Sequence, residues 1–204
     1  MTKIKFCGMR RREDILAANE IHPDYIGMIC SDGFRRSVPQ EKAAELKSLL
    51  DPEILSVGVF VDEPYEKIAA YLKKGIIDIV QLHGSESQYY IEKLREVMIF
   101  QDTLVPVIRA YQIRSEKDLE AARHSVADYV LLDSGRGTGR TFDWSVIHDI
   151  GRDFFLAGGL TPENAGSAVD AVHPFAIDMS SGIETDGMKD PDKMRRAAEE
   201  VRKR

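Results

Sequence analysis

Short apolar runs alternate with helical patterns along the whole chain. Eight runs rich in β-branched residues predict strands at Lys3–Cys7, Tyr25–Cys30, Ile54–Val61, Ile77–Leu82, Leu104–Ala110, Tyr129–Asp133, Asp153–Ala157 and Phe175–Asp178. Several runs, such as SVGVFV and YVLLD, are apolar at nearly every position. That pattern is typical of parallel strands that helices cover.

A helix is expected after every strand. Its start is marked in several places by a cap-like pair: Ser115 with Asp118, Thr161-Pro162, and Asp190-Pro191. The pattern is weakest over residues 86–99 and 143–150, where we still expect helices. The last helix carries an apolar stripe formed by Met194, Ala197, Ala198 and Val201.

Eight strand–helix units at intervals of about 25 residues predict a closed (β/α)8 barrel, an α/β TIM barrel with a parallel eight-stranded sheet. We expect it to form a single domain over residues 1–204. A doubly wound open sheet is the alternative architecture. In a barrel the active-site groups gather at the C-terminal ends of the strands, so candidate chemistry is sought there.

Composition narrows the class of protein. The 204 residues are 43% hydrophobic and 30% charged, a globular balance without a linker segment. The net charge of −6 argues against a nucleic-acid surface and requires any phosphate to be held locally. The first residues do not resemble a signal peptide, and no apolar run approaches the ~20 residues of a membrane helix. We therefore expect a cytoplasmic protein whose Cys7 and Cys30 remain thiols.

Residues that can act in acid–base chemistry or bind a ligand occupy the predicted strand ends. They are Cys7, Arg35 and Arg36, Asp62, His83, Asp133, Gly158 and Gly159, and Asp178 with Ser180, Ser181 and Gly182. The loops after the last two predicted strands are rich in glycine, so backbone N–H groups there can approach an anion. In (β/α)8 barrels these loops often bind phosphate. Gly158, Gly159, Ser180, Ser181 and Gly182 are thus candidate phosphate ligands.

Cys7 and Asp133 end the first and sixth predicted strands, which face the same mouth of a barrel. A thiol and a carboxyl in those places can flank a small molecule and serve as base and acid. The alternative is that Cys7 only packs and that Asp133 only caps its own turn. Neither CxxC nor HxxxH occurs, and no Walker lysine or Rossmann glycine pattern follows the first strand, so we expect no metal and no redox or nucleotide cofactor.

The motifs KFCGMRRRED, VGVFVD, VQLHG, DSGRGTGRTFDW, LAGGLTPEN and DMSSGIETDGMKD occur in this order. Together they closely resemble the phosphoribosylanthranilate isomerase family of tryptophan biosynthesis. The resemblance implies a (β/α)8 barrel that converts N-(5-phosphoribosyl)anthranilate to 1-(2-carboxyphenylamino)-1-deoxyribulose 5-phosphate by an Amadori rearrangement, without a cofactor. It implies that Cys7 is the general base and Asp133 the general acid.

The resemblance also assigns binding residues. The arginine of the family's SPRxV motif, which contacts the anthranilate carboxylate, corresponds to Arg36, but FRRSV departs from that motif and leaves Arg35 as an alternative. His83 either lines the aromatic pocket or packs on the rim, and Asp178 either binds sugar hydroxyls or orients the SSG loop. A base thiol must be partly ionised near neutrality, whereas an acid carboxyl must keep its proton.

Rival interpretations remain at this point. An indole-glycerol-phosphate synthase would need strand-end lysines, and a histidine-pathway isomerase would need an aspartate in place of Cys7. A barrel that binds phosphate without catalysis would not need both Cys7 and Asp133. The expected partner is a phosphorylated sugar–anthranilate substrate, with no nucleic acid and no membrane, and the chain is either a monomer or a homodimer.

Overall fold

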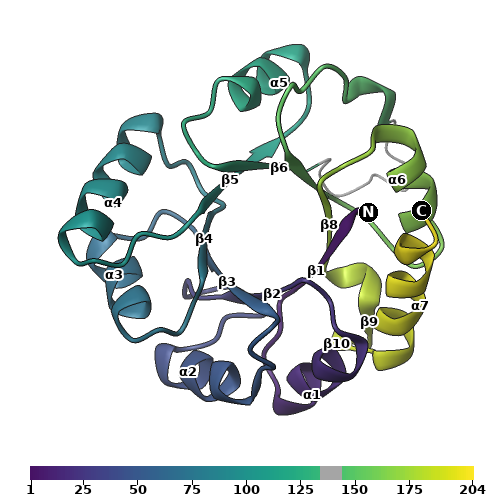
Figure 1. Cartoon of the computed structure of the whole chain (residues 1–204), viewed down its shortest axis with the longest axis horizontal. Helices are drawn as coiled ribbons and strands as arrows, with labels where there is room; N and C mark the ends of the chain where they lie inside the picture. The colour runs from purple at the N-terminus through teal and green to yellow at the C-terminus, as the bar shows by residue number, and fades with distance from the viewer. Residues whose placement is uncertain (134–143) are drawn as a thin grey trace.

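Eight parallel strands pair in chain order, and the last strand returns to pair with the first. The computed structural model describes residues 1–133 and 144–204. The strands are β1 (Lys3–Cys7), β2 (Tyr25–Ile29), β3 (Leu55–Phe60), β4 (Ile79–Leu82), β5 (Val107–Gln112), β6 (Tyr129–Asp133), β7 (Phe154–Ala157) and β8 (Ala176–Met179). The barrel is therefore confirmed and the open sheet is wrong, because an open sheet has no pairing between β1 and β8 (Figure 1).

Helices surround this barrel (Figure 1). In the described ranges they are α1 (Arg12–Ile21), α2 (Gln40–Leu49), α3 (Tyr65–Lys73), α4 (Gln88–Phe100), α5 (Glu116–Arg123), α6 (Ala165–Val172) and α7 (Pro191–Arg202). Two 3-10 turns, η1 (Trp144–Val146) and η2 (Ser181–Ile183), and a short antiparallel pair, β9 (Glu184–Thr185) with β10 (Met188–Lys189), complete the elements. None of these helices has the length and apolarity that crossing a membrane requires.

Most helix predictions are confirmed, including the weak one over 86–99, which corresponds to α4. In α7 the predicted apolar stripe is buried, and Asp190 caps the helix by accepting from the backbone of Asp192 and Lys193. The helix expected over 143–150 is wrong for the part that the structure describes, because residues 144–150 contain only η1. Asp149 and Gly151 have φ values of 48° and 66°, and left-handed residues so close together leave no room for a stable helix.

Strand β5 begins at Val107, three residues later than predicted. Pro106 has no N–H to donate to a sheet, and Leu104 before it is 63% exposed. The apolar character of this segment therefore extends beyond the strand to the surface. A similar shift occurs at α6, where Asn164 accepts from the backbone N–H of Thr161 and the helix begins only at Ala165.

Side chains alternate between the lumen of the barrel and the outer shell. The lumen holds a buried cluster formed by Tyr25, Val57, Ile79, Ile108, Ala110, Leu131, Phe155, Ala157 and Ala176. Rings of Tyr25, Tyr129, Phe155 and Phe175 fill its N-terminal end, with centroid distances of 5.1–5.8 Å. The N-terminal half of the lumen is thus packed, and the mouth at the C-terminal ends of the strands is left for polar groups.

Candidate active site

Cys7, His83, Asp133 and Asp178 all face the lumen near its C-terminal mouth. Asp133 and Asp178 each follow a residue of the lumen cluster, Leu131 and Ala176, by two positions. Strand alternation therefore points both carboxyl groups inward. The structure brings together at one mouth four of the residues that the sequence placed at strand ends.

Cys7 is the last residue of β1 and is only 8% exposed. Its sulfur lies against Gly27 of the neighbouring strand, where an added Cβ would be 2.8 Å from the Sγ atom. Gly8, at φ 82°, then turns the chain away from the sheet. Both Gly8 and Met9 donate their N–H groups to the Gly27 carbonyl at 2.9 Å, which fixes the turn beside the thiol.

Burial raises the pKa of the Cys7 thiol above its usual value. The ammonium groups of Lys5 and Lys189 oppose this shift, and the Asp178 carboxylate adds to it, but burial outweighs the cations. A base that is partly ionised near neutrality was expected from the sequence. In the chain by itself the surroundings favour the protonated thiol instead.

Lys5 and Asp178 form a buried ion pair inside the barrel. Lys5 Nζ lies 2.8 Å from Asp178 Oδ2, and the two side chains are 0% and 7% exposed. They are register partners of β1 and β8. Within residues 1–133 and 144–204, the other carboxylate oxygen, Asp178 Oδ1, is buried and has no hydrogen-bond partner. It is therefore an acceptor available to a hydroxyl group of a bound molecule.

His83 and Asp133 approach each other across the mouth, with Nε2 3.7 Å from Oδ2. Their side chains are 32% and 21% exposed, so both remain accessible. The other ring nitrogen of His83 lies 2.9 Å from Gln81 Nε2 on the same strand. These contacts hold the imidazole at the rim beside the carboxyl group.

A buried arginine, Arg109, holds the loop that carries His83 by hydrogen bonds to its backbone. Arg109 donates to the carbonyl groups of Leu82 and Gly84, at 3.2 and 3.0 Å. Its guanidinium also lies 3.4 Å from Glu86, which accepts from the N–H of Gly84 at 2.9 Å. A side chain at Gly84 would collide with Asp62 on the preceding loop, so only glycine allows the two loops to approach.

The two candidate arginines meet one carboxylate, Glu184, at 2.7 Å each. Arg36 is the more buried, with 17% of its side chain exposed against 54% for Arg35. The Arg36 side chain crosses Gly8, where an added Cβ would be 2.5 Å from Arg36 Cδ. Arg36 therefore lies beside the turn that follows Cys7, whereas Arg35 extends to the carbonyl group of Gly187.

Arg36 contacts Glu184 through Nε only. In the part of the chain that the structure describes, no acceptor is bonded to its terminal nitrogens. These two nitrogens are the pair with which a guanidinium binds a carboxylate in a bidentate manner. The hydrogen bond from Nε to Glu184 therefore leaves the two terminal nitrogens of Arg36 available to a carboxylate.

The loops after β7 and β8 touch each other. A Cβ at Gly182 would lie 1.9 Å from the carbonyl oxygen of Leu160, a contact that only glycine permits. Gly158 and Gly159 have φ values of 99° and 63°, and Ser181 and Gly182 form the turn η2. Ser180 donates its hydroxyl to the Cys7 carbonyl at 3.0 Å, which ties this loop to the turn after β1.

Comparison with known proteins decides the family. The family profile described as N-(5'phosphoribosyl)anthranilate (PRA) isomerase matches residues 4–200. The chain belongs to this family. An N-(5'-phosphoribosyl)anthranilate isomerase of Thermoanaerobacter sp. (strain X514) is 39% identical over 99% of this chain and 98% of that protein.

Solved structures agree. The phosphoribosyl anthranilate isomerase of Thermotoga maritima has a TM-score of 0.90 at 35% identity, with both chains fully covered. A phosphoribosyl anthranilate isomerase in complex with reduced 1-(o-carboxyphenylamino)-1-deoxyribulose 5-phosphate has a TM-score of 0.87, also at 35% identity and full coverage. A further structure contains monomers generated from the dimeric Thermotoga maritima enzyme. The resemblance, the barrel fold and the isomerase activity in tryptophan biosynthesis are thereby confirmed.

Some motif residues of the family lie outside the described part of the chain, and others lie at the site without having been predicted there. Most of the DSGRGTGRTFDW motif, residues 134–143, falls outside the described residues. Lys5 of KFCG, and Glu184 and Lys189 of SSGIETDGMKD, lie at the site although the sequence does not predict them as site residues. The signal for Lys5 was a charged residue that alternates with Ile4 and Phe6 in an apolar strand.

Glu184 is the centre of a cationic cluster. Besides the two arginines it accepts from Lys189 Nζ at 2.9 Å, and its side chain is 6% exposed. Burial pushes the pKa of Glu184 upward, but hydrogen bonds from Arg35, Lys189 and Arg36 outweigh this effect and lower it from 4.5 to about 2. The carboxylate therefore stays charged at any physiological pH.

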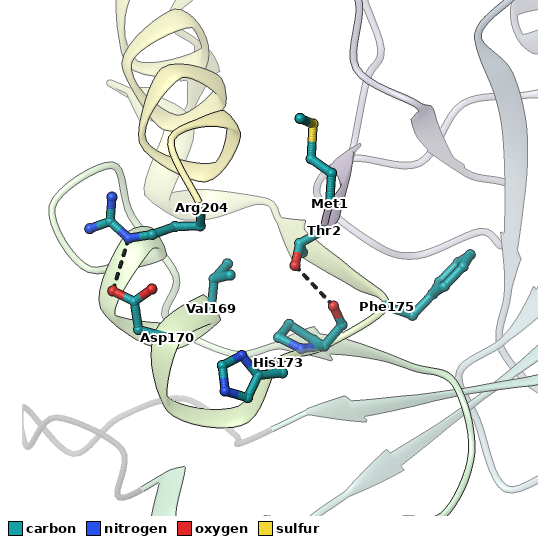
Figure 2. Close-up of a pocket in the computed structure, with 8 residues that line it drawn as sticks. Met1, Thr2, Val169, Asp170, His173, Phe175 and Arg204 are labelled. Atoms are coloured by element: carbon teal, nitrogen blue, oxygen red, sulfur yellow. Dashed lines mark hydrogen bonds and ion pairs between the residues drawn. The ribbon is translucent and has the colours of Figure 1, made fainter.

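Other sites of the described chain lie away from the mouth. A cavity of about 460 Å³ lies next to the starts of β1 and β8, among Met1, Thr2, Val169 and His173 (Figure 2). One group of side chains could approach a metal ion, His22 with Asp51 and Glu53, and these precede β2 and β3 at the N-terminal end. Neither place contains a predicted site residue.

We predict that Glu184→Gln lowers the free energy of unfolding at pH 7 by about 3 kcal/mol, since three cations lose their counter-charge. Because the pKa of the folded state is lowered, this contribution is present above pH 4.5 and is lost as the pH falls through 2. Urea unfolding between pH 7 and pH 2.5 measures it. Glu163→Gln, which removes an exposed charge paired with Arg196, is the control and should cost less than about 1 kcal/mol. A constant difference at every pH would contradict the prediction.

Proposed function

We propose that Cys7 is the general base and Asp133 the general acid of the isomerisation. Asp133 protonates the ring oxygen of the ribose, the bond between this oxygen and C1 breaks, and the lone pair of the anilino nitrogen forms a protonated Schiff base with C1. The positive charge acidifies the hydrogen on C2, which Cys7 removes to give an enolamine, and tautomerisation then yields the ketone. Each proton transfer contributes about 10²–10⁴-fold to the rate.

One observation supports this assignment most strongly. Cys7 and Asp133 end β1 and β6, which β7 and β8 separate, and both side chains point into the same lumen. A ribose between them would meet the thiol on one side and the carboxyl on the other. The high pKa of the buried thiol also fits this order of events, because the cationic Schiff base forms before the base is needed and favours the thiolate.

The remaining mouth residues are proposed to hold the substrate. Arg36 binds the anthranilate carboxylate through its terminal nitrogens, and His83 lines the aromatic ring. Asp178 Oδ1 accepts a hydrogen bond from a hydroxyl group of the ribose chain, which gives this buried oxygen a partner.

The phosphate is proposed to bind between the two touching loops. Gly158 and Gly159 lie in one of these loops and Ser181 and Gly182 in the other, and such loops bind phosphate in many (β/α)8 barrels. Ser180 supports the same loop through the Cys7 carbonyl. Phosphate binding far from the bond changes anchors the sugar while its other end reacts.

We predict that Cys7→Ala and Asp133→Asn each lower kcat by about 10²-fold or more, because each variant loses one proton transfer. Loss of anthranilate fluorescence from freshly prepared phosphoribosylanthranilate measures turnover, and circular dichroism checks the fold. Cys30→Ala is the matched control, since Cys30 is buried in the outer core and should leave kcat within a few-fold. Near-normal turnover of either active-site variant would refute its role.

Arg36→Ala should raise KM by roughly 10–100-fold with a smaller change in kcat, because a charge-assisted pair is worth about 1.5–3 kcal/mol. Arg35→Ala should raise KM much less, since the Arg35 side chain is half exposed and extends toward Gly187. Steady-state kinetics of both variants decide the matter. A larger rise in KM for Arg35→Ala would assign the carboxylate to Arg35.

We further propose that residues 1–204 act as one domain in the cytoplasm. Strands from the two ends of the chain, β1 and β8, are direct partners, so neither half can close the barrel alone. Cys7 and Cys30 are both free thiols, as expected for a reducing compartment.

We also propose that the chain is a homodimer that associates through the N-terminal end of its barrel. Ile99, Phe100 and Leu104 follow one another around the end of α4 and are 65%, 90% and 63% exposed. Apolar side chains exposed together in this way mark association surfaces. The end of a helix that leads into a strand lies at the N-terminal face, opposite the active-site mouth.

Phe100→Glu should therefore halve the mass of the native dimer in sedimentation velocity, because a charge replaces an apolar contact. Tyr89→Glu, at the other end of α4 and 64% exposed, is the matched control and should leave the dimer intact. A native chain that sediments as a monomer at high micromolar concentration would contradict the proposal.

A further inference from the structure

Lys5 is a charged residue that the proposed mechanism leaves unused. Its side chain is wholly buried, although lysine is almost never buried without a partner. It lies two residues before Cys7 on β1, so both side chains point into the lumen. The ammonium group is close enough to the thiol for the two groups to interact electrostatically.

The Lys5 ammonium is held in place from the neighbouring strand. Asp178 is its register partner on β8, and the two charged groups are 2.8 Å apart. The carboxylate thereby fixes the position of the ammonium group.

The other cations near Cys7 form hydrogen bonds with Glu184 and with the backbone of the loop after β8. Lys189 Nζ donates to the Ser180 carbonyl and to Glu184, both at 2.9 Å, and Arg36 donates to Glu184. On β2 the neighbour of Cys7 is Gly27, which carries no charge, and Cys30 follows that strand as a buried thiol. Lys5 is therefore the cation best placed to act on the sulfur.

We propose that Lys5 is a positioning residue for the base: its ammonium, anchored by Asp178, stabilises the Cys7 thiolate once the thiol has released its proton to water at the mouth of the barrel. The proposal rests on the proposed role of Cys7. A bare thiolate in a lumen that excludes water is costly, and a fixed ammonium within reach offsets much of that cost without a change in structure. Lys5 itself neither gains nor loses a proton in this step.

The two members of the pair act on the thiol in opposite directions. Burial raises the pKa of Cys7, Lys5 is the strongest influence that lowers it, and Asp178 raises it. Removing the lysine should therefore make the thiol a weaker acid, and removing the carboxylate should make it a stronger one. A general disturbance of packing would not produce shifts of opposite sign.

The test uses a Cys30→Ala background, in which Cys7 is the sole cysteine of the chain. The rate of alkylation by iodoacetamide is followed from pH 6 to pH 10.5 by mass spectrometry, because only the thiolate reacts. Lys5→Met should slow alkylation at pH 8 by at least about tenfold, and Asp178→Asn should accelerate it. A rise of about one in the pKa of Cys7 lowers the fraction of thiolate about tenfold.

Lys5→Met leaves a buried carboxylate unpaired and can fail to fold, so a second pair of variants keeps the test decisive. Asp178→Asn with Lys5→Met has neither charge. It should be alkylated at pH 8 at least about tenfold more slowly than Asp178→Asn alone. Equal rates for these two variants, or shifts of the same sign for both single variants, would overturn the proposal.

Alkylation does not depend on whether Cys7 is the base, so the two proposals fail separately. If Cys7→Ala remains active, the proposed base is wrong even when Lys5 controls alkylation. If Cys7→Ala is inactive but the rate of alkylation is the same with and without Lys5, only the role of Lys5 is wrong. When both hold, the alkaline shift of the kcat/KM profile in Lys5→Met should follow the shift in alkylation.

Discussion

The pairing of β1 with β8 is the constraint on which the rest of the structure depends. It closes the barrel and sets Lys5 opposite Asp178 in the lumen. Without closure, neither charge could be buried, because each is paired with a residue from the other end of the chain. The same register brings Cys7 to the mouth and lets Ser180 reach its carbonyl group. One backbone pairing thus sets both the position of Cys7, the proposed base, and the charged groups that surround it.

The lumen divides along the barrel axis into two environments. Packed aromatic rings fill its N-terminal half, and the C-terminal half contains Lys5, Gln81 and Asp178, whose charges and dipoles stay unscreened by water. Burial there raises the proton affinity of Cys7, while the ammonium below works against it. The balance suits a base that needs to ionise only when a cationic intermediate lies beside it.

The rim is held rigid by groups that do not touch the proposed substrate. Glu184 orients Arg36 through Nε, and Arg109 fastens the loop of His83 through its carbonyl groups. Glycines at positions 8, 84 and 182 permit contacts between neighbouring loops that a Cβ would prevent. A loop-built site can reach the precision of a rigid one when neighbouring loops are fastened to each other in this way.

The sequence by itself determined the alternation of strands and helices, the strand-end positions of Cys7 and Asp133, and, through its motifs, the family. These features follow from local periodicity and from the order of residues along the chain. Only the tertiary structure decided that the 3-10 turn Trp144–Val146 replaces a helix over 144–150, that Arg36 rather than Arg35 lies beside the turn after Cys7, and that Lys5 is paired with Asp178. The reason is physical, because each of these features depends on contacts between residues that are distant in the chain. Arg123 holds the carbonyl group of Asp149, Arg36 crosses Gly8, and a buried lysine is neutralised by a residue 173 positions away. No local pattern encodes such contacts.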